Sequence, residues 1–234
     1  MDVHKLTKRE VNWMHQHLAR EILDNYEFLW VLEGCMNNAA SSVWAIGEFP
    51  WSAGYVICHR QCHWLRLNNE KFMEPLLDCL PKEPILKFYV DNRVTLEMLT
   101  RWYPGGMFSE STLFVRRNSQ SWRKRFDLDL IQEEESTLGR RMLFGNQLGP
   151  VATITAKAVV KPYVEISEWT LHCEENRWFW LEQAIGLTTG IFMAKGKPMV
   201  IRVNQDPLKE SLGVLGYREF SPLYYYMAIK DQQI

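Results

Sequence analysis

The sequence has no excess of charge of either sign and no long apolar run. Its 27 basic and 28 acidic residues give a formal net charge of −1, which argues against binding nucleic acid or an anionic membrane through bulk charge. No run approaches the roughly 20 apolar residues that a membrane span requires. We therefore expect neither nucleic acid nor a membrane among the partners of this protein.

Cysteine is also scarce, and the first ten residues carry no export signal. Their sequence, MDVHKLTKRE, has no apolar stretch behind its positive charges. The five cysteines are an odd number and are scattered along the chain, which is typical of reduced thiols. We expect a cytoplasmic protein whose 234 residues pack a core without disulfides or a structural metal.

The cluster Cys58-His59-Arg60-Gln61-Cys62-His63 is a candidate for half of a zinc site. A structural zinc site needs four ligands, and no second pair with matching spacing occurs elsewhere in the sequence. Residues 55–67 alternate in a way that favours a single strand, with His59 and His63 on one face and Cys58 and Cys62 on the other. We therefore expect no metal.

Tryptophan, by contrast, is abundant. The chain has ten tryptophans, and aromatic residues make up 13% of it. Large amphipathic rings line a core, a groove or an interface, and their number alone does not distinguish these roles.

The order of predicted elements indicates an α/β protein with two domains, residues 1–120 and 121–234. Thr7 and Glu10 form a capping-box pattern, and apolar residues recur at helical spacing from there to Tyr26. A basic block at 117–125 precedes the acidic residues 133–135, which favours a solvated connection, a nucleic-acid patch being the alternative. No internal repeat is detectable.

The second half has the pattern of a βαβ unit. Its predicted elements are strands at 151–159 and 163–172, a helix at 178–195, a strand at 199–204 and a helix at 207–215. Such a unit places a ligand cleft at the carboxyl ends of its strands.

Residues from about Met142 to Met227 resemble the GNAT superfamily of acyl-CoA-dependent N-acyltransferases. The resembling motifs are Gly149-Pro150-Val151-Ala152-Thr153-Ile154, Val164-Glu165-Ile166, Val200-Ile201-Arg202-Val203-Asn204 and Leu215-Gly216-Tyr217-Arg218-Glu219. The resemblance implies an α/β (α+β, GNAT-like) fold, with a mixed central sheet flanked by helices. A smaller, divergent α/β domain would precede the GNAT-like domain.

The same resemblance implies transfer of an acetyl or longer acyl group from coenzyme A to the amine of a small molecule or peptide. Glu165 fits the position of the base best, and Glu168 is the second catalytic candidate, on the opposite face of the strand by simple alternation. The residues that would bind the acyl-CoA are Leu171, His172, Cys173, Arg177, Trp178, Phe179, Trp180 and Asn204.

Two departures from the family pattern support an alternative function. The expected pyrophosphate loop contains no glycine, and Trp178, Phe179 and Trp180 stand there instead, either as buried core side chains or as ligand contacts. The helix before Gly216 lacks the tyrosine that protonates the leaving thiolate in many family members. The alternative is a catalytically silent module that binds another ligand or a protein. The oligomeric state stays open, a homodimer being one alternative.

Overall fold

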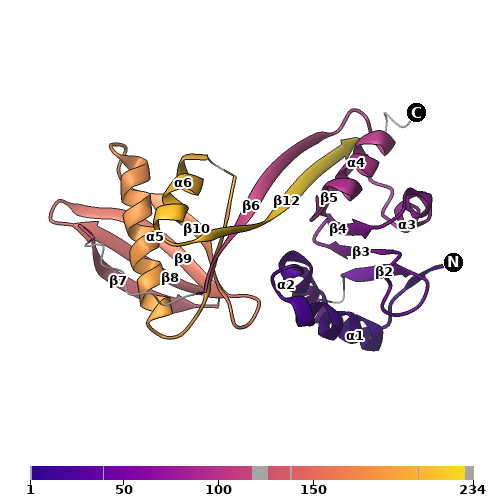
Figure 1. The fold of residues 1–234 in the computed structure, drawn as a ribbon, viewed down its shortest axis with the longest axis horizontal. Coiled ribbons are helices and arrows are strands. Elements are labelled where there is room, and N and C mark those ends of the chain that lie inside the picture. The colour runs from indigo at the N-terminus through magenta and orange to yellow at the C-terminus, as the bar shows by residue number, and fades with distance from the viewer. Residues whose placement is uncertain (1, 39, 118–125, 138, 205, 230–234) are drawn as a thin grey trace. The chain divides into compact units, whose positions relative to one another are not determined.

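The computed structural model describes residues 2–38, 40–117, 126–137, 139–204 and 206–229 (Figure 1). The chain forms two compact units, one of Met1–Ser111 with Ser221–Ile234 and the other of Thr112–Phe220. Two strands, β6 (Met107–Arg116) and β12 (Arg218–Ile229), run from one unit into the other. The predicted boundary between residues 120 and 121 falls within 118–125, outside the described residues.

The first unit is a mixed sheet with helices. Its remaining elements are β1 (Val3–Lys5), α1 (Lys8–Leu18), η1 (Ala19–Glu21), α2 (Tyr26–Met36), β2 (Ser42–Ile46), β3 (Gly54–His59), β4 (Cys62–Leu67), η2 (Glu70–Phe72), α3 (Met73–Leu77), β5 (Ile85–Val90) and α4 (Arg93–Trp102). Its strand order is β1-β2-β3-β4-β5-β12-β6, and β4 and β5 are parallel. The last strand of the chain therefore completes the sheet of the first unit.

Helix α1 begins as the sequence predicts. The Thr7 amide donates to the Glu10 carboxylate at 2.8 Å, and the Glu10 amide donates to Thr7 Oγ1 at 3.3 Å, which closes the capping box. The helical spacing does not continue unbroken to Tyr26, however. The turn at Ala19–Glu21 ends α1, and Asn25 holds this turn because its side-chain amide donates to the Leu18 carbonyl at 3.0 Å.

The predicted single strand at 55–67 is wrong, because the chain reverses in its middle. Strands β3 and β4 form an antiparallel hairpin in which His59 pairs with Cys62. Arg60 and Gln61 form the turn with φ of 48° and 63°, which are the left-handed values that a tight two-residue hairpin requires. The described residues contain no group of three or more His, Cys, Asp or Glu side chains that could hold a metal ion.

The second unit carries the predicted βαβ pattern. Its elements are β7 (Asp129–Ser136), β8 (Gly139–Asn146), β9 (Gly149–Ala158), β10 (Val164–Leu171), α5 (Arg177–Met193), β11 (Met199–Val203) and α6 (Asp206–Val214). The strand order is β6-β11-β10-β9-β8-β7, and α5 connects the parallel pair β10 and β11. Helix α5 lies across one face of this sheet, where Leu181 and Ile185 pack on Ile154 of β9 (Figure 1).

The acidic residues 133–135 belong to a strand rather than to a solvated connection. All eight residues of β7 are exposed, and all of them except Ile131 pair with β8. Opposite charges face one another across this pair: Glu133 forms an ion pair with Arg140, and Glu134 is the register partner of Arg141. These acidic residues therefore complement the basic residues of the neighbouring strand.

The two units repeat one order of elements, although the sequence shows no repeat. In the first unit the order is β2-β3-β4-α3-β5-α4, and in the second it is β8-β9-β10-α5-β11-α6. In both, three antiparallel strands are followed by a helix and a parallel strand. No helix in the described part of the chain is long and apolar enough to span a membrane.

Candidate functional site

Strands β10 and β11 pair only near their beginnings. Their parallel register joins Val164 to Met199, Glu165 to Val200 and Ile166 to Ile201. Strand β10 then continues to Leu171 and β11 continues to Val203 without further pairing between them. The two strands therefore part toward their carboxyl ends, where ligands bind in open α/β sheets.

A β-bulge in β10 lies where the strands part. Ile166 pairs with Ala156 of β9 and Glu168 pairs with Thr155, so Ser167 is one extra residue on β10. The Ser167 hydroxyl donates to the Thr155 carbonyl at 3.3 Å. An extra residue bends the bulged strand and increases its twist, which gives a physical reason for the loss of pairing with β11.

The bulge also changes which residues share a face. Simple alternation predicts Glu165 and Glu168 on opposite faces, and this prediction is wrong. Glu165 pairs with Lys157 and Glu168 pairs with Thr155, two residues apart on β9, so both carboxylates lie on the same face of the sheet. The face is the one opposite α5, because Ile166 and its own register partner Ala156 point the other way, into the core beneath the helix.

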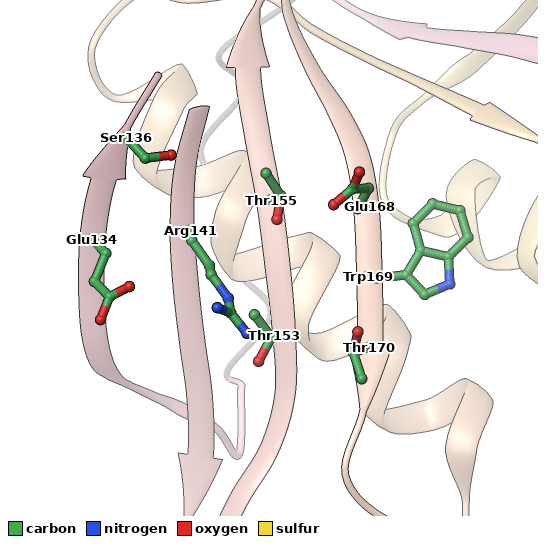
Figure 2. Close-up of a pocket in the computed structure, with 8 residues that line it drawn as sticks. All are labelled: Glu134, Ser136, Arg141, Thr153, Thr155, Glu168, Trp169 and Thr170. Carbon is green, nitrogen blue, oxygen red and sulfur yellow. The ribbon is translucent and has the colours of Figure 1, made fainter. Parts of the chain in front are cut away.

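A polar row crosses this open face. Glu134 of β7 is the register partner of Arg141 of β8. Thr155 of β9 has Arg141 as its register partner on one side and Glu168 of β10 on the other. A pocket with a volume of about 310 Å³ lies over this row, with α5 behind the strands (Figure 2). The residues that line it are Glu134, Ser136, Arg141, Thr153, Thr155, Glu168, Trp169 and Thr170.

The predicted acyl-CoA contacts at the end of β10 are held by β9. The His172 amide donates to the Val151 carbonyl at 2.8 Å, and His172 Nε2 lies 2.8 Å from Thr153 Oγ1. Leu171 and Cys173 are half-buried against the core under α5. Of this group, His172 is therefore the side chain that contacts a residue of the pocket.

The remaining predicted contacts surround the beginning of α5. The first amide with an acceptor inside the helix is that of Trp180, which donates to the Asn176 carbonyl at 3.1 Å. Arg177 lies 3.7 Å from the Glu174 carboxylate, in an exposed ion pair. Asn204 is exposed directly after β11, the strand that parts from β10.

The three aromatic residues of this turn differ in burial. The side chains of Trp178 and Phe179 are 41% and 45% exposed, so interpretation as core residues is wrong for them. Trp180 packs against the core, and its ring meets that of Phe179 edge to face at 4.9 Å between centroids. Two of the three rings are therefore available to a ligand or partner.

A tyrosine near the end of the unit does not replace the missing acid. The Tyr217 hydroxyl is buried and lies 2.7 Å from Thr189 Oγ1. Burial raises the pKa of this phenol far above its ordinary value. Tyr217 therefore has a structural role, because its hydroxyl connects the beginning of β12 to Thr189 of α5.

The corresponding position of the first unit is filled by its own side chains. Strands β4 and β5 also part, after Trp64 pairs with Tyr89. Beyond that point Arg66 forms an ion pair with Asp91, and Thr95 Oγ1 lies 3.3 Å from the amide and 3.1 Å from the carbonyl oxygen of Leu67. These contacts use the groups that a ligand would need, which favours the second unit as the location of the site.

Comparison with solved structures identifies the fold. A GNAT-family acetyltransferase from Colwellia psychrerythraea is similar over 97% of this chain and 100% of its own, with a TM-score of 0.60 at 9% identity. A GCN5-related N-acetyltransferase from Sphaerobacter thermophilus is similar over 97% of this chain and 95% of its own, with a TM-score of 0.60 at 11% identity. The chain has a GNAT fold.

A tandem GNAT protein from the clavulanic acid biosynthesis pathway has the same repeated architecture. It covers 97% of this chain and 98% of its own length, with a TM-score of 0.56 at 8% identity. No family model matches the sequence, and a search of curated proteins found no significant match. Identities of this size carry the GNAT fold and leave the chemistry to the residues of this chain.

Sequence reasoning missed the residues that complete the open face of this GNAT fold. The sequence pattern assigns Glu134 to a solvated connection and predicts no strand at 139–146, so neither Glu134 nor Arg141 is among the predicted site residues. The alternation of Arg141 with buried Met142 carries a strand signal. Only the pairing of β7 with β8 and of β8 with β9, however, brings Arg141 into one row with Glu168.

Proposed function

We propose that the protein is an acyl-CoA-dependent N-acyltransferase whose reaction takes place in the second unit. The observation that carries this proposal is the bulge at Ser167. It accompanies the parting of β10 from β11 and brings Glu165 and Glu168 to one face beside the opening. An opening between strands suits a narrow thioester arm, and adjacent carboxylates suit the removal of a proton from an amine.

The reaction requires two proton transfers and one exchange of bonds. Glu165 or Glu168 accepts a proton from the acceptor ammonium, directly or through water. The freed nitrogen attacks the thioester carbonyl, so that a C–N bond forms, the C–S bond breaks and the coenzyme A thiolate leaves. The nitrogen loses its second proton as the amide forms, and water can carry this proton to the thiolate, so the reaction does not depend on a phenol such as the buried Tyr217.

The donor would lie with its pyrophosphate at the beginning of α5. Amides that precede Trp180 have no acceptor within the helix, and they combine with the helix dipole to favour an anion. Trp178 and Phe179 lie outward of this turn, where their exposed rings can flank the donor. Without the glycines, we expect weaker donor binding than the family pattern would give.

Calorimetry with acetyl-CoA and longer acyl-CoAs tests donor binding, and release of free thiol in the presence of amines tests turnover. We expect Glu165→Gln or Glu168→Gln to reduce turnover about 10²- to 10⁴-fold, the usual contribution of general base catalysis. Glu210→Gln, on the exposed surface of α6, is the matched control and should leave turnover unchanged. Failure of every acyl-CoA to bind at millimolar concentration would reject the proposal.

The second candidate function is a silent module that binds a ligand or protein through the aromatic turn. Exposure of Trp178 and Phe179 beside the acidic residues Glu174 and Glu175 favours it, because neighbouring carboxylates repel a phosphate. Turnover of any amine that is lost in a Glu165 or Glu168 variant would exclude this candidate.

A further inference from the structure

Arg141 and Glu168 place opposite charges on the open face without forming an ion pair with each other. Both are register partners of Thr155, one from β8 and one from β10. Adjacent strands lie about 4.8 Å apart, so roughly 10 Å separates the backbones of these two residues. Within the described part of the chain, neither side chain has a hydrogen-bond or ion-pair partner. Opposite charges therefore face a shared pocket without neutralising each other.

The neighbouring charges show that this strand pair can form closed ion pairs. One residue earlier on β8, Arg140 turns to the other face, where it pairs with Glu133 and lies 5.8 Å from the centre of the Phe192 ring. On the open face, Glu134 instead accepts a hydrogen bond from the Gln132 side chain at 2.6 Å. The guanidinium of Arg141 therefore lies in the lining of the pocket (Figure 2).

We propose that this pocket binds the acceptor as a free amino acid, with Arg141 on its carboxylate and Glu168 on its ammonium group. The proposal rests on the proposed acyltransferase function and names its acceptor class. A guanidinium presents a planar pair of donors that matches a carboxylate, and a carboxylate accepts from an ammonium. Thr155, between the two charges, and Thr153 and Thr170 in the next row add hydroxyl groups.

The size of the pocket and its charges limit the acceptor further. A volume of about 310 Å³ is near the lower end of the usual range of about 300–1,000 Å³ for ligand pockets, which fits a compact amino acid. Acylation converts the ammonium into a neutral amide, so the product keeps its partner at Arg141 and loses its charge partner at Glu168. The product is therefore held less tightly than the substrate.

The test compares amino acids with acceptors that lack the carboxylate. Thiol release is measured with the standard amino acids, with the carboxamides of those that react, and with simple amines such as ethanolamine and putrescine. We expect turnover with at least one amino acid and a large loss with its carboxamide. Arg141→Gln should raise the KM for that amino acid roughly ten- to 100-fold, the range for a hydrogen bond to a charged group, and leave the KM for acyl-CoA unchanged.

Arg140→Gln is the matched control, since it removes the same charge one residue away on the opposite face. Both variants are checked for folding by circular dichroism, and Arg141→Lys tests whether a positive charge without the planar fork suffices. Turnover confined to simple amines, or a KM for amino acids that Arg141→Gln does not change, overturns the acceptor assignment while acyl transfer stands.

Failure of the proposed function gives a different result. If no acyl-CoA binds and no acceptor reacts, amino-acid binding is measured alone by the chemical shifts of the ¹⁵N-labelled protein. Shifts that depend on Arg141 and not on Arg140 would still support an amino-acid site. Absence of binding in that experiment would overturn this inference together with the proposed function.

Discussion

Deletion of Ser167 should close the opening between β10 and β11 without moving any core side chain to the surface. After the deletion, Ile166, Glu168 and Trp169 alternate as a regular strand, with the same faces that the bulged strand gives them now. Strand β11 extends two residues beyond its last pair, Arg202 and Val203, so the straightened β10 can pair with both. Backbone groups of β10 that now border the opening would then form hydrogen bonds with β11.

The expected loss follows from those backbone groups. If two hydrogen bonds to the thioester arm are lost, at about 0.5–1.5 kcal/mol each, donor binding weakens by about 1–3 kcal/mol. This corresponds to a rise in the Kd for acyl-CoA of roughly five- to 150-fold, measured by calorimetry. Stability should change little, because the deletion trades a bulge for regular pairing.

Ser167→Ala is the matched control for this deletion. It keeps the extra residue and removes only the hydroxyl that donates to the Thr155 carbonyl, so it should bind acyl-CoA as the unmodified protein does. Circular dichroism and thermal melting establish that both variants fold. An acyl-CoA Kd within twofold of the unmodified protein in the folded deletion variant would refute the link between the bulge and the donor site.

Two further predictions concern stability. Trp180→Ala should lower the free energy of unfolding in urea by about 1–3 kcal/mol, less than the cost of truncating a fully buried tryptophan. Trp178→Ala should change it by less than about 1 kcal/mol, because this side chain is exposed. Equal losses in the two variants would contradict this difference in burial. Burial, followed by the positive charge of Arg60, lowers the pKa of His59, whose Nδ1 lies 2.6 Å from Ser41 Oγ. The unfolded chain therefore takes up a proton near pH 6.5 where the folded chain does not. The contribution of neutral His59 to the free energy of unfolding is therefore complete above about pH 7, and it is lost as the pH falls below 6.5. Comparison of urea unfolding at pH 7.5 and 5.5 should show a smaller pH dependence in His59→Asn, and an unchanged dependence would count against this cause.

Local signals in the sequence predict much of the second unit. The strand of small and β-branched residues, β9, and the helix that precedes Gly196, α5, both appear close to their expected limits. The capping box of Thr7 and Glu10 likewise marks the start of α1. These elements follow from propensity and periodicity within a few residues, which are properties that a single sequence carries.

Features that depend on pairing between strands are not predicted. The hairpin turn at Arg60 and Gln61 uses left-handed backbone in residues that rarely adopt it, so no glycine or asparagine marks it. Strand β7 is exposed on every residue, and it becomes a strand because its charges match those of β8. Neither feature has a hydrophobic pattern of its own.

The bulge at Ser167 has the largest consequence of these unpredicted features. One extra residue reverses the face of every later side chain of β10 relative to simple alternation. Simple alternation therefore predicts Glu165 and Glu168 on opposite faces, and only the pairing with β9 shows that they share one face. The same register places Arg141 opposite Glu168 across Thr155. The candidate site is thus a property of strand register, and its two charged ends, which lie 27 residues apart in the sequence, share no local motif.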